Sequence, residues 1–130
     1  MSKPQPPEPV CKAILLCQKT IIEADTEAVS LIGVFDSFGV GDDLVTGSAE
    51  AFCQITEAEG EYELTLEIHD LSTGSIIARG EGITLIINDR LMRANVIVPI
   101  PAMKFSHTGV FDFVILANGA EIDRQTFNVK

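Results

Sequence analysis

The sequence predicts an all-β protein, an antiparallel β-sandwich of about eight strands. Three observations support this prediction. Apolar and polar residues alternate along several segments, which is the period of strands that bury one face. Turn-forming residues recur about every ten residues, as they do in small sandwich domains. No segment of normal helix length repeats its apolar residues with the helical period.

Length and composition agree with one folded domain. The chain has 130 residues, of which 46% are hydrophobic, and a chain of this size buries roughly two-thirds of the surface that it exposes when unfolded. Residues 1–10 are rich in proline and show no periodicity, so we expect a flexible tail there. The single β-sandwich domain is then expected to span residues 11–130. The first nine residues lack the apolar region of a secretory signal, and no apolar run is long enough to span a membrane.

The first two expected strands are apolar on both faces. In residues 13–22 and 29–38, apolar side chains occupy both odd and even positions. Such strands either are covered on both sides or pass from one sheet to the other partway along. A longer loop with three glycines follows over residues 39–47.

The clearest alternation lies over residues 61–69. The apolar side of this strand carries Tyr62, Leu64, Leu66 and Ile68. The polar side carries Glu61, Glu63 and Glu67. Like charges in a row repel one another across a sheet, so this face is expected either to look into open solvent or to be met by cations.

Two prolines mark the strand that we expect over residues 92–100. Pro99 and Pro101 either end this strand or place it at the edge of a sheet, because proline cannot donate a hydrogen bond to a neighbouring strand. Turn signals before it fall at residues 59–60, 72–74, 81–82 and 88–90.

Residues 109–130 predict a β-hairpin. Its turn is Asn118-Gly119, a pair in which both residues accept the positive φ of a type I′ turn. On the return strand, Ile122 and Phe127 fall on opposite faces if a single period is kept. We therefore expect a β-bulge near residues 123–125.

The expected architecture is immunoglobulin-like without the Cys-Trp-Cys core. Cys17 and Cys53 have a tolerable spacing for that core, but the chain contains no Trp. With Cys11 the number of cysteines is odd. An odd number without an export signal favours reduced thiols and a cytoplasmic protein.

Several short runs, spread over nearly the whole chain after the tail, resemble those of one protein family. They are Leu15-Leu16-Cys17, the run from Val29 to Asp36, the alternating run from Tyr62 to Asp70, Gly109-x-Phe111-x-Phe113 and Asn118-Gly119. They are similar to the corresponding runs of a family of small, uncharacterised bacterial proteins of about this length. The resemblance implies a single β-sandwich domain of unknown function and brings with it no catalytic residue, ligand or partner.

Charge is distributed unevenly along the chain. Residues 20–78 carry 13 of the 19 acidic residues and no Lys or Arg, and the whole chain has a net charge of −10. Such charge disfavours nucleic acid and anionic membranes as partners. It suits a cationic partner, a divalent metal or the basic part of another copy of the chain. The basic residues available for self-association are Arg79, Arg90, Arg93, Lys104 and Arg124, and an isologous dimer could pair the acidic half with the basic half.

The sequence gives little support for catalysis. His69 lies on the polar face of residues 61–69, and His107 lies in a turn region. Neither has the spacing of a metal ligand relative to a Cys or a second His. Cys53 is expected to point inward and His69 outward, which argues against a catalytic dyad. We therefore expect a protein that is not an enzyme and that has no cofactor.

A second interpretation is a domain that binds a small molecule or a divalent metal. Asp36, Asp42 and Asp43 flank a loop that contains Gly39 and Gly41. Carboxylates on a flexible loop are ligands that calcium prefers, although the EF-hand spacing is absent. A solvated acidic loop explains the same residues.

The main interpretation is a non-catalytic protein-interaction or accessory module that binds a protein partner or another copy of itself. Sandwich domains leave edge strands, which pair with other chains unless they are blocked. The expected interaction face consists of Glu61, Glu63, Glu67, Arg90 and Arg93. Association through exposed charge pairs would weaken as salt rises.

Overall fold

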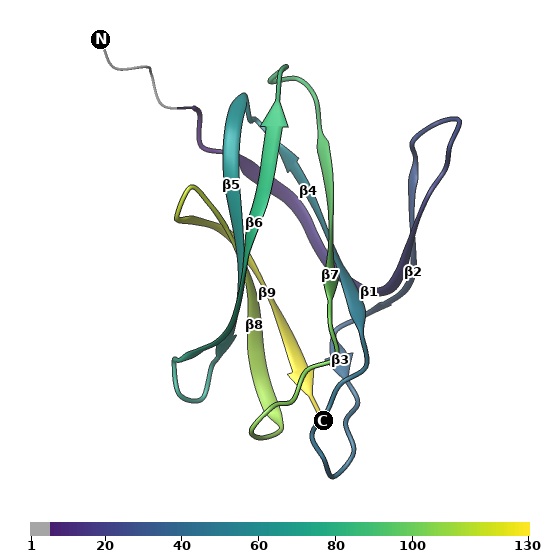
Figure 1. The fold of residues 1–130 in the computed structure, drawn as a ribbon, viewed down its shortest axis with the longest axis vertical. Coiled ribbons are helices and arrows are strands. Elements are labelled where there is room, and N and C mark those ends of the chain that lie inside the picture. The colour runs from purple at the N-terminus through teal and green to yellow at the C-terminus, as the bar shows by residue number, and fades with distance from the viewer. Residues whose placement is uncertain (1–5) are drawn as a thin grey trace.

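The computed structural model describes residues 6–130 and shows a β-sandwich of nine strands (Figure 1). The strands are β1 (Val10–Ile22), β2 (Val29–Phe35), β3 (Ser37–Phe38), β4 (Ala49–Thr56), β5 (Gly60–Asp70), β6 (Ile76–Ile87), β7 (Ala94–Ile100), β8 (Gly109–Ala117) and β9 (Ala120–Val129). They form two sheets, of order β2-β1-β4-β7 and β3-β9-β8-β5-β6. The predicted all-β sandwich is confirmed. Residues 6–130 contain no helix, and hence none that could cross a membrane.

The order of the strands is immunoglobulin-like. In the lettering of immunoglobulin domains, β1, β4 and β7 take the places of strands A, B and E, and β9, β8, β5 and β6 take those of G, F, C and C′. In an immunoglobulin domain, strand D continues the first sheet beyond E. No strand of the described residues takes that place, so β7 is an edge strand. Both alternatives expected for Pro99 and Pro101 hold: β7 is an edge strand, and it ends at Ile100, before Pro101.

The core fills the space between the two sheets. The four apolar side chains predicted to point inward from β5 are all buried; they are Tyr62, Leu64, Leu66 and Ile68. Phe111 and Phe127 stack with ring centroids 5.9 Å apart, and Phe105 meets both rings edge-on. The alternation along residues 61–69 was therefore a correct guide to the buried face.

The described part of the N-terminal tail is in contact with the sandwich. The Tyr62 hydroxyl donates a hydrogen bond to the carbonyl of Pro7 (2.6 Å), and Pro9 is buried. The first strand then begins at Val10. The flexible tail that we expected over residues 1–10 falls in part, at residues 1–5, outside the described residues.

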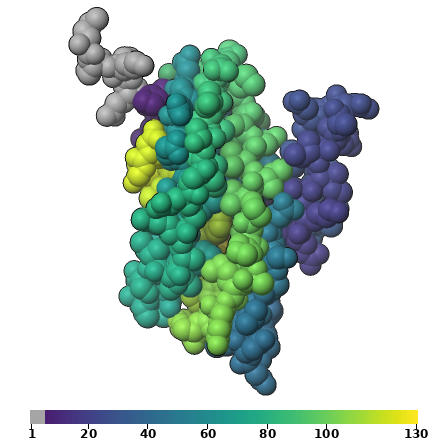
Figure 2. All heavy atoms as spheres, in the orientation of Figure 1, coloured from purple at the N-terminus to yellow at the C-terminus, as the bar shows by residue number. Residues whose placement is uncertain are grey.

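The apolar segment 29–38 passes from one sheet to the other, as one of the two expectations required, whereas residues 13–22 stay in one sheet. β2 ends at Phe35 in one sheet, and β3 begins at Ser37 in the other. β1 pairs with β4 only as far as Cys17. Beyond that point β1 and β2 continue as a two-stranded hairpin arm, residues 18–35, which stands away from the body of the molecule (Figures 1 and 2).

Two contacts hold the base of the arm. The Glu50 carboxylate accepts hydrogen bonds from the Thr20 backbone N–H (2.9 Å) and hydroxyl (3.2 Å), in place of the strand neighbour that β1 has lost. Gly33 has a φ of 67°, and a Cβ there would lie 2.7 Å from the Gln18 side chain. Only glycine fits this conformation and this close approach without strain.

The positions of turns and bulges confirm some expectations and correct others. Asn118 and Gly119 both have positive φ, as the predicted turn requires. The bulge of β9 lies at Ile122, just before the expected range of residues 123–125. Residues 81–82 do not form a turn but a bulge inside β6, where Gly82 has a φ of 87° and the register with β5 shifts. An extra residue with positive φ bends a strand without ending it.

Candidate functional site

An apolar groove opens between β6 and β7 on one side of the sandwich. β6 is the edge of one sheet and β7 is the edge of the other, and no strand of residues 6–130 bridges them. The groove has a volume of about 300 Å³ and is lined mostly by apolar side chains. Figure 2 looks onto this side and shows a hollow between the two strands, through which more deeply placed atoms are visible.

The lining of the groove is part of the hydrophobic core. It includes Leu66 and Ile68 of β5, Val98 and Ile100 of β7, and Phe113 of β8. Each of these side chains is less than a tenth exposed. Because no strand covers the gap between β6 and β7, the core can be reached from solvent at this place.

Two cations stand at the ends of the exposed edge strand β7. Arg93 precedes the strand and Lys104 follows it, and both are exposed. Neither forms an ion pair within residues 6–130, whereas Arg79, Arg90 and Arg124 each do. β7 itself carries no charge. The open edge is therefore an uncharged strand between two cations that have no partner in the described chain.

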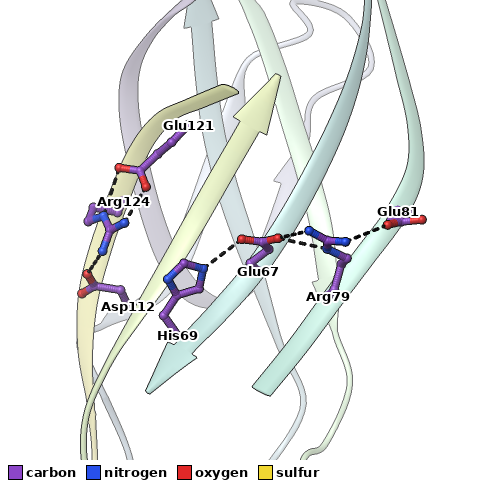
Figure 3. A network of polar contacts seen from close by, with 7 residues as sticks. All are labelled: Glu67, His69, Arg79, Glu81, Asp112, Glu121 and Arg124. Carbon is purple, nitrogen blue, oxygen red and sulfur yellow. Dashed lines mark hydrogen bonds and ion pairs between the residues drawn. The ribbon is translucent and has the colours of Figure 1, made fainter. Parts of the chain in front are cut away.

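Glu67, one of the residues expected on the interaction face, is buried. It is 4% exposed, and its carboxylate accepts a hydrogen bond from Arg79 (2.6 Å) and lies 2.8 Å from Nε2 of His69 (Figure 3). The hydrogen bonds from His69 and Arg79 lower the pKa of the Glu67 carboxyl. A cation of the same chain, Arg79, therefore meets the last glutamate of the row, while Glu61 and Glu63 stay exposed.

A second ion-pair cluster lies on the same outer face. Arg124 donates hydrogen bonds to Glu121 and, at 2.8 Å, to the buried Asp112 (Figure 3). Thr126 donates a further hydrogen bond to Asp112 (2.6 Å). The bonds to Glu121 and Asp112 raise the pKa of the Arg124 guanidinium. These contacts explain how acidic residues can be buried on this outer face, in agreement with the alternative that cations meet it.

Ser72, His107 and Asp70 meet at one end of the sandwich but do not form a catalytic triad. In a triad, the carboxylate holds one ring nitrogen of the histidine and the serine hydroxyl meets the other. Here Asp70 and Ser72 both approach Nε2 of His107, at 2.6 and 3.4 Å, and Nδ1 contacts the Thr108 carbonyl. The Ser72 hydroxyl donates to Asp70 (2.7 Å). No ring nitrogen is left to take the proton of the serine.

The candidate metal ligands do not form a site. Residues 6–130 contain no group of three or more His, Cys, Asp or Glu side chains that could hold a metal ion. Asp43 accepts a hydrogen bond from the Val45 backbone N–H (3.2 Å), and Asp36 accepts one from the Ser37 hydroxyl (3.4 Å). The acidic residues of this loop, Asp42 included, thus have no shared geometry that would favour a cation.

Comparisons with known proteins show the fold and no family. No family model and no curated protein matches this sequence. The chain is similar to the alkylpurine DNA glycosylase AlkC from Pseudomonas fluorescens bound to DNA containing an abasic site analogue, with 14% identity and a TM-score of 0.51, over 73% of this chain and 27% of that one. It is also similar to an immunoglobulin-like protein from Pseudomonas aeruginosa, with 10% identity and a TM-score of 0.46, over 95% and 98% of the two chains. This chain thus spans about a quarter of the length of that glycosylase structure.

The groove could not be predicted from the sequence, and only one signal pointed toward it. The missing strand beside β7 is a property of the strand order, which cannot be read from alternation. Pro99 indicated an edge, but not that the edge exposes the core. Of the expected interaction face, Arg93 alone lies at the end of this open strand, whereas Arg90 pairs with Glu57 at 3.7 Å.

Proposed function

We propose that this chain is a non-catalytic protein-interaction module that binds an extended segment of a partner chain in the groove between β6 and β7. The observation that carries the proposal is the uncovered core beside the unpaired edge of β7. An exposed apolar groove marks a binding surface more often than chance. An unpaired edge strand supplies main-chain hydrogen bonds to an added strand.

The groove and its surroundings define the chemistry of the ligand. Apolar side chains at every second position would enter the groove, because alternate residues of a strand point to the same face. Acidic residues at the two ends of the bound segment would meet Arg93 and Lys104. The ligand is therefore an extended, apolar segment of about seven residues with flanking acids, matched to the length of β7.

Other features support a binding role in the cytoplasm and do not support catalysis. The net charge of −10 disfavours nucleic acid and anionic membranes. All three cysteines are free thiols, which suits a reducing compartment. The histidines lie against carboxylates of the chain itself, Glu67 and Asp70. These contacts give both histidines a role in the fold that does not require catalysis.

Selection of peptides from a random displayed library tests this function without knowledge of the natural partner. The bait is the wild-type chain, and the blocking variant is Ala78→Lys, since Ala78 lines the β6 wall of the groove and a lysine would fill it. The matched control is Ile86→Lys, which places the same side chain on an exposed position of β6 outside the groove lining.

The expected result is a set of peptides with alternating apolar residues and flanking acids. They should bind the wild-type chain and the Ile86→Lys control alike, and lose at least tenfold in affinity for Ala78→Lys. Peptides that bind all three proteins equally, or a library that yields no peptide of this pattern, would show that the groove is not a binding site.

A further inference from the structure

We infer that the segment that fills this groove is β2 of a second copy of this chain, so that copies join head to tail through β2 of one and β7 of the next. The inference rests on the proposed function and names its partner. It follows from four properties of the described residues: the exposure of β2, the direction of its backbone groups, its charge pattern and its length.

The first property is that β2 is an exposed edge. It is the last strand of its sheet and pairs with β1 alone. Ile32 and Val34 are 47% and 54% exposed. No charged residue or proline lies within β2, although these are the usual means by which edge strands are kept from pairing. Since the arm holds β2 away from the body (Figure 2), another molecule can reach this edge.

The second property is the direction of the backbone groups of β2. In an antiparallel pair, residues whose N–H and C=O groups face the neighbour alternate with residues whose groups face away. The Glu23 N–H donates to the Ala28 carbonyl (2.9 Å). Every second residue after Ala28 has the same orientation, so the backbone groups of Ser30, Ile32 and Val34 face β1. The free edge of β2 therefore presents the backbone groups of Val29, Leu31 and Phe35, with Gly33, which has a φ of 67°, between the last two.

The same alternation gives the free backbone groups of β7. The Thr20 N–H points toward β4, where it reaches Glu50. The registers of β1 with β4 and of β4 with β7 extend this alternation to β7. They place the backbone groups of Glu50 and Pro99 face to face. The N–H group that proline lacks would have pointed inward, toward β4. Pro99 therefore removes no donor from the open edge of β7. The residues whose backbone groups point to the open edge are Ala94, Val96, Val98 and Ile100.

The third and fourth properties, charge and length, select one register. β2 and β7 both have seven uncharged residues. If the two strands run antiparallel with their ends aligned, Val29 lies opposite Ile100 of the second copy. Residues whose backbone groups point to the free edge of β2 then lie opposite residues whose backbone groups point to the open edge of β7. Asp36, just after β2, then falls opposite Arg93 of that copy. A shift of two residues keeps the backbone match but moves Asp36 away from Arg93.

The other end of the pairing is complementary as well. Glu23, Asp25 and Glu27 are exposed in the turn of the arm, next to the start of β2. In the selected register this turn lies at the end of β7 that leads to Lys104. Arg93 and Lys104, neither of which forms an ion pair within residues 6–130, therefore both meet acids of the second copy.

The side chains of β2 suit the groove. Residues that face one another in an antiparallel pair share a face of the sheet. Val29 and Leu31 would therefore lie on the same side as Ile100 and Val98, which line the groove. On the outer face, the exposed Ile32 would lie beside Ile97. In immunoglobulin lettering, β2 of the second copy would occupy the empty place of strand D.

Pairing of β2 with β2 of another copy is less favourable. It would bring the acids that flank β2, Glu27 and Asp36, close to the same acids of the other chain, and it would leave the groove empty. The β2–β7 interface is heterologous, so copies would form a chain or close into a ring.

The experiment is sedimentation velocity over a concentration series at low salt, with charge-reversal variants and their mixture. Asp36→Lys and Arg93→Glu should each weaken association by roughly three- to tenfold, because each turns an exposed attraction into a repulsion. An equal mixture of the two variants should recover it, since the new lysine of one chain meets the new glutamate of the other. Added salt should reduce these differences.

The control Asp42→Lys makes the same change of net charge on an exposed loop position and should associate at least as well as the wild type. Failure of the mixture to recover, or tighter association of Asp36→Lys than of Asp42→Lys, would overturn the β2–β7 pairing and favour β2–β2. A wild-type chain that is monomeric at every concentration would overturn the inference as a whole.

The two proposals fail in different ways. Asp36→Lys leaves the groove unchanged, so it should still bind the selected peptides. Peptide binding by a chain that never self-associates keeps the proposed function and rejects the second copy as its ligand. Self-association that Ala78→Lys does not disturb would instead reject the groove as the place of contact.

Discussion

The two sides of the sandwich differ in how the sheets are joined, and the proposed binding surface lies on the side where they are not joined. On the closed side, β1 packs against β9 and β3 pairs with β9, and the Lys130 N–H donates to the Phe38 carbonyl (2.9 Å). On the open side, β6 and β7 leave a groove into the core. β1 and β3 close one side against β9, and no strand of the described chain closes the other. The binding that we propose thus depends on a place in the sheet that no strand of the described chain fills.

The charges of the open side show a parallel contrast. Arg79 donates to the buried Glu67 and belongs to the folded domain, whereas Arg93 and Lys104 have no ion-pair partner in residues 6–130. The long acidic stretch suggested a large charged face, but its buried members are neutralised by the chain itself. What the open edge offers a partner is an uncharged strand with a cation beyond each end.

The largest effect is expected where the open side meets the core. Phe113 is 3% exposed and lines the groove. Phe113→Ala should lower the free energy of unfolding by about 3–5 kcal/mol, measured by urea denaturation. Val110→Ala on the same strand, at a position that is 43% exposed, should change it by no more than about 0.5 kcal/mol. Equal effects would mean that the groove lining is not part of the core.

The next effect separates the two arginines of the open side. Arg79→Met leaves Glu67 buried with His69 as its remaining partner, so the melting temperature should fall by several degrees. Arg93→Met removes a side chain without an ion pair, so the melting temperature should stay within about one degree while self-association weakens. Circular dichroism and sedimentation velocity measure the two outcomes.

A double variant provides the control for the first arginine. Replacing both members of a buried pair by apolar residues is often close to neutral. Glu67→Leu combined with Arg79→Met should therefore recover part of the lost melting temperature. If it does not, the role of Arg79 is to cover the sheet with its apolar stem and not to neutralise Glu67.

A smaller effect concerns pH and the loop at the end of the groove. Contacts of His107 with the Thr108 carbonyl (2.7 Å) and with Asp70 (2.6 Å) raise its pKa above 6.5. A group with a raised pKa stabilises the fold fully below its unfolded pKa, and the stabilisation is lost as the pH rises through the folded pKa. The melting temperature should therefore decline above about pH 6.5. His107→Gln should remove this decline, and a wild-type profile that is flat there would contradict the assignment.

At low pH the carboxylate of the same pair becomes decisive. The hydrogen bond from Ser72, and after it that from His107, lower the pKa of Asp70 to about 2. The stabilisation from Asp70 is present above its unfolded pKa of 3.8 and is lost as the pH falls toward 2. In Asp70→Asn this acid-dependent loss should be smaller, which thermal melts between these pH values would show.

The strands could be predicted from the sequence because their faces differ in polarity, whereas the site could not. Alternation identified the buried face of residues 61–69, and Asn118-Gly119 identified the turn of the last hairpin. The burial of Glu67 was missed because its partner Arg79 lies on the next strand and comes opposite only through the register of β5 and β6. A turn was predicted at residues 81–82 because glycine is common in turns. Glycine with a positive φ also occurs in β-bulges, and Gly82 lies in one.

The smallest effect tests the closed side through the reactivity of a thiol. Cys11 of β1 is only partly buried, yet burial together with the nearby Asp123 of β9 raises its pKa to about 11. At pH 8 about one thiol in a thousand is then a thiolate, the reactive form. Labelling by a disulfide reagent should be slow and should speed up roughly tenfold per pH unit up to pH 10. Asp123→Asn should raise the rate at pH 8 by a few-fold, because it removes the negative charge that opposes ionisation.

Cys53, with a pKa raised to about 12 by burial, should stay unlabelled in the folded chain. Labelling of Cys11 at the rate of an unfolded control would show that β1 and β9 separate readily, and the closed side would then be no more closed than the open one.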